Sequence, residues 1–147
     1  MLVDTPTQSL LYTLEQAIKT YRRLCQHNVD AVMSDLTVDQ ALTLIVLDKH
    51  PELSQHQLAE RVFKDKASIT RIIDLLIKKN LLTRHLHDTD RRKFALRITV
   101  QGRDILAQLR DTIRLNQRTA LAGLTEAELQ QFEQVLLKII GNCALPK

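Results

Sequence analysis

The spacing of apolar residues along the chain predicts a mainly helical protein that contains one hairpin. Over most of the sequence, apolar residues recur at intervals of three and four, as they do on one face of an α-helix. Between residues 81 and 98 the interval falls towards two, which is typical of a β-hairpin. The predicted helices lie near residues 6–33, 38–48, 55–62, 66–79, 100–121 and 126–143.

Capping signals predict where four of these helices begin. A Thr or Ser is followed three residues later by Gln or Glu at Thr37, Ser54 and Thr125. In this pattern the hydroxyl and the later side chain each satisfy a backbone N–H at the start of the helix. Thr5 is followed by Pro6, a residue suited to the first helical position, so we expect Thr5 to cap the first helix.

The first and last helices each carry a narrow apolar seam with alternating steps of three and four, as in coiled coils. One seam consists of Leu11, Leu14, Ile18, Tyr21 and Cys25. The other consists of Leu129, Phe132, Leu136, Ile139 and Cys143. The seams could pack on each other within one chain or on a second copy. We expect a homodimer whose interface includes Leu11, Leu14, Ile18, Leu129, Phe132, Leu136 and Ile139.

The middle of the chain contains a candidate DNA-reading helix. Residues 54–79, SQHQLAERVFKDKASITRIIDLLIKK, predict two helices joined by a short turn. The second has an apolar stripe on one face and a polar face opposite it, formed by Lys66, Ser68, Thr70 and Arg71. Small hydrogen-bonding side chains and an Arg in the first turns of a helix suit the major groove, where Arg binds guanine. The start of the preceding helix, near Ser54 and Gln55, could offer backbone N–H groups to a phosphate.

Charge is concentrated in the same region. The whole chain carries a net charge of +4, but residues 54–103 hold twelve Lys and Arg against five acidic residues, a net charge of +7. The rest of the chain therefore carries a net charge of −3. A basic centre of this kind favours a polyanionic partner, although a solvated Lys-rich surface would have the same composition.

The hairpin that follows has a highly charged tip, Asp88-Thr89-Asp90-Arg91-Arg92-Lys93. Helix, turn, helix and basic hairpin is the order of a winged helix-turn-helix. Over about 50 residues the chain resembles the DNA-binding core of MarR-type transcriptional regulators. The matching motifs are LAERV, ASITR, the Leu-Leu-x-Arg entry to the hairpin, Asp90-Arg91-Arg92 and the closing Ile98-Thr99-x-x-Gly102.

The resemblance implies a mainly α fold with terminal dimerisation helices and a β wing of two or three strands. Residues 1–36 and 100–147 would form the dimerisation region, and residues 37–99 the DNA-binding region. In the wing, Asp90 would hold one arginine while another enters the minor groove; the sequence leaves open which of Arg91 and Arg92 does which. Lys93 would contact a phosphate.

One position departs from the family pattern. The recognition helix usually ends at Gly, and this chain has Asn80 instead. Asn is the next most tolerant residue for the left-handed backbone conformation, so we expect the turn to be kept.

The function implied is that of a homodimeric, sequence-specific DNA-binding regulator, expected to be a repressor, on a pseudo-palindromic operator. A small aromatic or phenolic ligand, bound between the dimerisation helices and the winged region, would release it. Two alternatives remain: an oxidant sensor that uses Cys25 or Cys143, and a winged-helix protein-interaction module that does not bind DNA.

Other kinds of chemistry have little support. The sequence has no Gly-rich phosphate loop, nucleophile elbow or clustered acid pair, so we expect neither an enzyme nor a cofactor. His85-x-His87 could place two imidazoles on one face of a strand, but two ligands without a third make a weak metal site, so we expect no metal. The absence of a secretory signal or an apolar run of roughly 18 residues favours a cytoplasmic protein.

Overall fold

Local capping chemistry determines where the helices of the computed structural model begin. The side-chain hydroxyls of Thr37, Ser54 and Thr125 each accept a bond from the backbone N–H three residues later. Their own backbone N–H groups donate to the Gln or Glu side chain at that later position. The three predicted capping boxes are therefore confirmed. The structure describes residues 2–86, 89–90 and 94–146.

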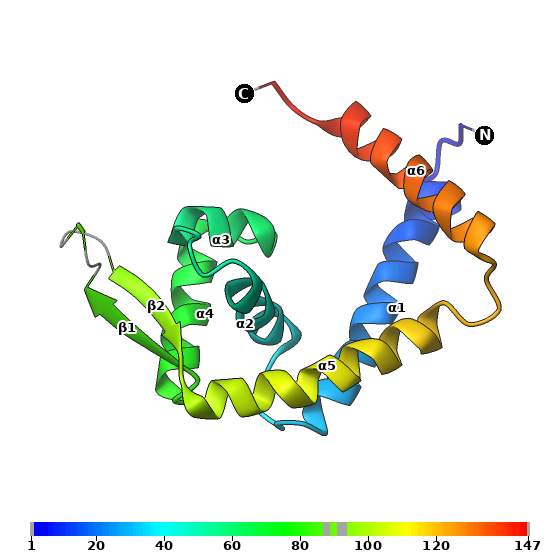
Figure 1. Ribbon diagram of the computed structural model, residues 1–147. Helices are drawn as coiled ribbons and strands as arrows, with labels where there is room; N and C mark the ends of the chain where they lie inside the picture. The colour runs from blue at the N-terminus through cyan, green and yellow to red at the C-terminus, as the bar shows by residue number, and fades with distance from the viewer. Residues whose placement is uncertain (1, 87–88, 91–93, 147) are drawn as a thin grey trace. The chain divides into compact units, whose positions relative to one another are not determined.

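Within these residues, six α-helices and one hairpin follow one another in the predicted order (Figure 1). The helices are α1 Leu10–Asp30, α2 Val38–Lys49, α3 Gln55–Arg61, α4 Lys66–Lys78, α5 Val100–Ala120 and α6 Glu126–Cys143. The strands are β1 Leu82–Leu86 and β2 Phe94–Ile98. They pair antiparallel, and Arg84 faces Leu96 across the hairpin.

The start of the first helix differs from the prediction. Thr5 makes no side-chain capping bond, and Pro6–Gln8 form only a short 3₁₀ turn, η1. Ser9 is the N-cap instead, because its extended backbone lets Oγ accept a bond from the N–H of Tyr12 at 3.1 Å. The Thr5 prediction was wrong because two capping residues compete within five positions and sequence spacing does not rank them.

The core lies between α2, α3, α4, the base of the hairpin and the first turns of α5. The predicted apolar stripe of α4 forms its centre: Ile69, Ile73 and Leu76 are fully buried, and Ile72 is nearly so. They pack against buried leucines from the neighbouring elements, which are Leu36, Leu44, Leu47, Leu58, Leu81, Leu82, Leu106 and Leu109. The opposite face of α4 is therefore exposed to solvent.

The closing motif Ile98-Thr99-x-x-Gly102 has a structural explanation. Thr99 Oγ1 accepts a bond from the backbone N–H of Gly102 at 2.9 Å and so caps α5. A Cβ on Gly102 would lie 2.4 Å from the carbonyl oxygen of Leu81, which no other residue could tolerate without a shift. Asn80 has φ of 60°, so the predicted left-handed turn after α4 is confirmed.

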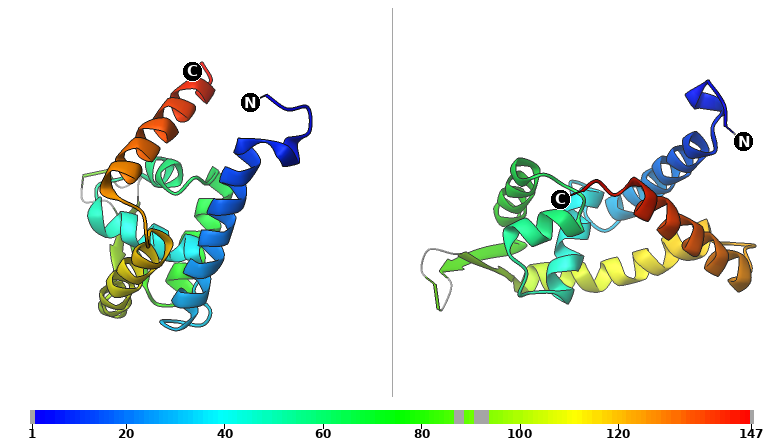
Figure 2. Two further views of the ribbon diagram at one scale, coloured as in Figure 1. Left: turned by 90° about the vertical axis from the view of Figure 1, so that its right-hand side faces the viewer. Right: turned by 90° about the horizontal axis from the view of Figure 1, so that it is seen from above.

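The chain consists of two compact units, Met1–Asn116 and Gln117–Lys147. In the first unit the hairpin extends away from the cluster of α2, α3 and α4, as the views in Figure 2 show. In the second, α6 has no buried residue. Within the described part of the chain, no helix has the length and apolar character needed to cross a bilayer.

Candidate nucleic-acid interface

The predicted recognition face of α4 begins at a capped helix end. Asp65 Oδ1 accepts a bond from the backbone N–H of Ser68 at 2.7 Å, which caps the helix. Hydrogen bonds from Ser68 also lower the pKa of this carboxyl group, so it remains ionised beside the positive end of the helix. Beyond the cap, Lys66 and Arg71 are exposed, whereas Ser68 and Thr70 are half-buried.

Two of the predicted contact residues bind each other. Gln55 Nε2 donates a bond of 2.6 Å to Thr70 Oγ1, and that hydroxyl donates to the carbonyl oxygen of Lys66 at 2.8 Å. Ser54 Oγ accepts the N–H of Gln57 as part of the capping box. The structure thus places Gln55 beside the predicted recognition helix, and the Gln55–Thr70 bond fixes the start of α3 against α4.

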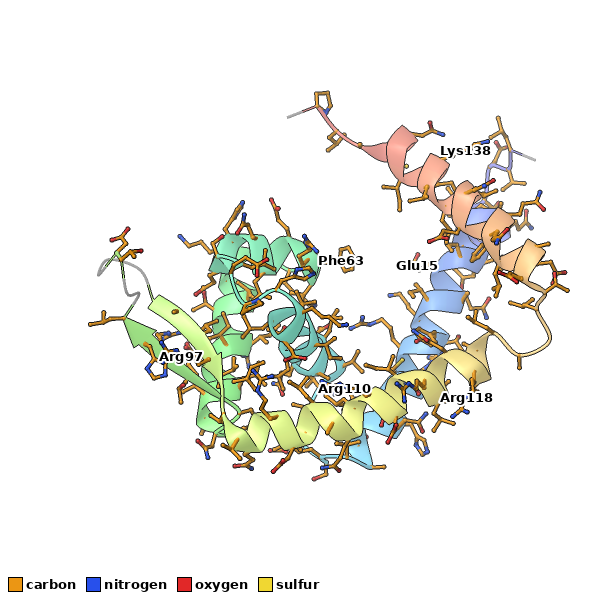
Figure 3. The ribbon with its side chains drawn as sticks, in the orientation of Figure 1. Glu15, Phe63, Arg97, Arg110, Arg118 and Lys138 are labelled. Atoms are coloured by element: carbon orange, nitrogen blue, oxygen red, sulfur yellow. The ribbon has the colours of Figure 1, made fainter. Side chains whose placement is uncertain are left out.

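The hairpin is connected to α4 by an ion pair. Arg84 interrupts the apolar alternation of β1, and the structure explains why: its Nη2 lies 3.1 Å from Asp74 Oδ1 on α4. Sequence reasoning did not assign either residue a role. It also missed Arg97, an exposed cation on β2 (Figure 3). The sequence signal for Arg97 was its position among the polar residues of a strand in which apolar and polar residues alternate.

The predicted wing-tip residues can be located only in part. Asp90 is half-buried. Arg91, Arg92 and Lys93 lie outside the described residues, as does His87 of the possible metal pair. His85 Nε2 lies 2.7 Å from Thr83 Oγ1 on the same strand.

A second feature of the first unit is a cavity of about 310 Å³ between α1, α2 and α5. Its walls are mainly apolar and its polar groups are few. The lining residues include Ile18, Tyr21, Arg22, Cys25, Val29, Ala41, Leu42, Ile45, Ile113 and Asn116. At one end Asn28 Nδ2 donates to Asn116 Oδ1 at 2.6 Å, so this buried amide of α5 is satisfied within the protein.

The two cysteines have different surroundings. Cys25 is buried in the wall of the cavity, and Cys143 is exposed near the end of α6. Burial raises the pKa of the neighbouring Tyr21 phenol, and the contact with Cys25 raises it further. A buried thiol beside a neutral phenol does not resemble the exposed, electropositive setting of a reactive thiolate.

Of the seven predicted interface residues on the terminal helices, three are exposed and four are half-buried. On α1, Leu11 and Ile18 are 58% and 50% exposed, and Leu14 is half-buried. On α6, Phe132 is 54% exposed. The other seam residues of α6, which are Leu129, Leu136 and Ile139, are half-buried. Each helix therefore has an apolar face that the described chain does not cover completely.

Comparison with known proteins shows which family and which solved structures the chain is similar to. Residues 34–93 match the MarR family. A probable transcriptional regulator from Pseudomonas aeruginosa is 25% identical, with a TM-score of 0.80 over 92% of this chain and 100% of that one. BpsR from Bordetella bronchiseptica, whose DNA binding is regulated by 6-hydroxynicotinic acid, is 21% identical, with a TM-score of 0.83 over 98% and 100%.

A mutant of MarR from E. coli, solved in complex with operator DNA, is 20% identical and has a TM-score of 0.81. The similarity covers 89% of this chain and 93% of that one. The matched region 34–93 contains α2, α3, α4 and β1, and thus the whole polar face of the recognition helix.

Proposed function

We propose that the chain is a MarR-type winged-helix regulator of transcription, and that it acts as a homodimeric repressor released from its operator by a small ligand. The observation that carries the proposal is α4, a helix with a fully buried stripe on one side and exposed Lys66 and Arg71 on the other. A helix packed in this way presents its first turns to the major groove.

Each part of the DNA-binding surface has a separate role in the proposal. Arg71 reads a guanine and Ser68 contacts a base or phosphate, because their side chains leave the first turns of α4. Thr70 and Gln55, bonded to each other, hold α3 in place. The start of α3 at Ser54 and Gln55 can then meet a phosphate through the backbone N–H of Gln55, because the N–H of Ser54 donates to Gln57. Asp90, Arg91, Arg92 and Lys93 form the wing contact to the minor groove.

Homodimerisation would place two recognition helices on one operator. Two-fold symmetric proteins bind half-sites about one helical turn apart, which gives a pseudo-palindrome. The uncovered apolar faces of α1 and α6 support this assembly. We assign the interface to the seam residues, which are Leu11, Leu14, Ile18, Leu129, Phe132, Leu136 and Ile139.

The cavity between α1, α2 and α5 is the proposed effector site. Its volume of about 310 Å³ and its apolar walls suit a small aromatic or phenolic molecule. The similar protein BpsR responds to an aromatic acid, which supports an effector of this kind. A ligand that favours a different spacing of the two recognition helices would release the operator.

Selection of bound sequences from random duplex DNA tests the proposed function directly. We expect enrichment of a pseudo-palindrome whose half-site centres lie about 10 base pairs apart. Binding to the selected duplex should weaken steeply as salt rises, because each phosphate contact releases counter-ions. No enriched sequence together with a flat salt dependence would contradict DNA binding and favour a protein-interaction module.

A further inference from the structure

The last residues of the proposed recognition helix are two neighbouring lysines with different surroundings. Lys78 ends α4 and is exposed, whereas only 15% of the side chain of Lys79, the C-cap, is accessible to solvent. The Lys79 ammonium group donates to the backbone carbonyl oxygen of Asp35 and, at 2.7 Å, to Gln40 Oε1. It also lies 4.0 Å from the carboxylate of Asp35. Lysines are seldom covered to this degree unless they are paired, so the contacts of Lys79 determine its position.

Gln40, the partner of Lys79, is itself held in place. It is 3% exposed, and its backbone N–H donates to Thr37 Oγ1 at 3.1 Å in the capping box of α2. Its Oε1 also accepts the backbone N–H of Thr37 at 3.3 Å. The Lys79 ammonium group therefore binds an acceptor that the capping box already fixes. This bond connects the end of α4 to the start of α2.

The residues after Lys79 connect the same end of α4 to a third helix (Figure 1). The carbonyl oxygen of Asn80 accepts a bond from Thr99 Oγ1 at 2.7 Å, and Asn80 Nδ2 donates to Gln101 Oε1 at 3.2 Å. The backbone N–H of Thr99 donates to the carbonyl oxygen of Leu81 at 3.1 Å. The C-terminal end of α4 is thus bonded both to the start of α2 and to the start of α5.

Base reading by α4 depends on how firmly both of its ends are held. A bidentate bond from Arg71 to guanine needs alignment within about 0.5 Å and 10–20°. The apolar stripe holds α4 against the core, but apolar contacts have no preferred direction. The Gln55–Thr70 bond supplies one directional contact beside Arg71. Lys79 supplies another about two turns further along, which limits both tilt and rotation of the helix.

We propose that Lys79 is a positioning residue for base reading: together with Gln40 it fixes the C-terminal end of α4, so that Arg71 meets its base pair in one orientation. Lys79 does not bind DNA itself, because its ammonium group is covered and donates to groups of the protein. The exposed Lys78 contacts a phosphate instead. This inference rests on the proposed function, in which α4 reads the operator.

Lys79→Met tests the positioning role, because it removes the ammonium donors and keeps an unbranched side chain. Its affinity for the selected duplex should fall about tenfold, since a displaced Arg71 loses its aligned contact to the base. Its affinity for an unrelated duplex of the same length should change less than about twofold, because phosphate contacts do not depend on sequence. For the unrelated duplex, the slope of log K against log salt should stay the same.

Lys78→Met is the matched control, because it removes the same charge one residue earlier in the chain. It should weaken binding to both duplexes by the same factor and reduce the salt slope by about 1, as expected for a lost phosphate contact. Circular dichroism checks that each variant is folded. A variant that was only less stable would lose affinity for both duplexes equally, because unfolded molecules bind neither of them.

Variants of Gln40 give an independent readout. Gln40→Glu keeps an oxygen that can accept from Lys79 and is compatible with a capping box, so it should retain discrimination between the duplexes within about twofold. Gln40→Met removes the acceptor and should reproduce the loss of discrimination seen in Lys79→Met. The double variant should lose no more discrimination than either single variant, because the two side chains act as one pair.

Four results would overturn the positioning role. These are full discrimination in Lys79→Met, an equal loss of affinity for both duplexes, a salt slope reduced as in Lys78→Met, or additive losses in the double variant. If the unchanged protein selected no duplex, the proposed function would fail and the positioning role would fail with it. If the unchanged protein selected a duplex and any of the four results followed, only the positioning role would be rejected.

Discussion

Gly102 and Asp39 show how single side chains control the packing and electrostatics of the first unit. At Gly102 the absence of a Cβ allows the start of α5 to approach the carbonyl oxygen of Leu81. At Asp39 one carboxylate neutralises two cations that belong to different elements, Arg22 of α1 and Lys64 of the turn between α3 and α4. Substitution at either residue should therefore affect contacts that lie outside its own helix.

Gly102→Ala should destabilise the protein. The new Cβ would lie 2.4 Å from the Leu81 oxygen and 2.8 Å from Cγ2 of Ile98, so backbone must move. We expect a loss of about 1–3 kcal/mol in the free energy of unfolding, measured with urea. Gly141→Ala is the control, because a Cβ there has no neighbour within 4 Å, and it should leave stability equal or raise it by up to about 1 kcal/mol. Equal effects of the two variants would contradict the close approach.

The stabilising effect of Asp39 should depend on pH. Its folded pKa lies below the ordinary 3.8, so the unfolded chain binds more protons and stability rises with pH through this range. The unchanged protein should be more stable than Asp39→Asn at pH 7 by about 1 kcal/mol, since the group is partly exposed. The difference should disappear as pH falls below the folded pKa. A constant difference in urea unfolding at pH 7 and in strong acid would contradict the ion pairs.

Among the elements, α4 combines two roles on opposite faces. Its buried stripe forms the centre of the core, and its exposed face carries the proposed base contacts. The Gln55–Thr70 bond and the Arg84–Asp74 ion pair connect it to α3 and to the hairpin. These two contacts hold α3, α4 and the strand β1 together as one preorganised surface for the proposed DNA contacts.

Arg71→Ala should reduce both affinity and specificity for the selected duplex. Loss of a bidentate contact to guanine costs about 1–3 kcal/mol and relaxes the preference at one base pair. Lys78→Ala, at the other end of the exposed face, is the matched control and should cause a smaller loss that is equal for all sequences. Titration of each protein variant with single-base variants of the duplex measures both its affinity and its specificity. If Arg71→Ala lowered the affinity equally for all duplex sequences, Arg71 would contact a phosphate and not a base.

For the whole molecule, the terminal helices raise the question of assembly. The apolar residues of α1 beyond its buried end, and those of α6, are exposed or half-buried in a single chain. Ile140 and Leu137, which adjoin the α6 seam, are 63% and 60% exposed. Burial of such faces against a second copy would remove apolar surface from water and stabilise a dimer.

Ile139→Glu should convert the dimer to monomers in sedimentation experiments, because it places a charge on the apolar seam. Gln130→Glu adds the same charge to the same helix two and a half turns earlier, on the opposite side, and should leave the dimer intact. Persistence of the dimer in Ile139→Glu would contradict the assigned interface. Monomers in both variants would indicate a general effect of charge on α6.

The sequence by itself determined the order of the elements, three of the capping boxes, the buried stripe of α4 and the left-handed turn at Asn80. These features depend on interactions within about four residues along the chain, so local spacing contains the necessary information. The same is true of the polar face of α4, because it lies opposite a stripe that periodicity locates. The family resemblance then supplied the expected role of that face.

Only the tertiary structure decided which side chains meet across elements. Arg22 and Asp39 are 17 residues apart, and Gln55 and Thr70 are 15 apart, so no local pattern links them. The choice of Ser9 over Thr5 as a cap likewise depends on the backbone path before α1. Pairings of this kind are set by the packing of whole helices, which fixes the direction of each side chain. For that reason local sequence patterns could not show which side chains line the cavity, nor that Asp39 pairs with both Arg22 and Lys64.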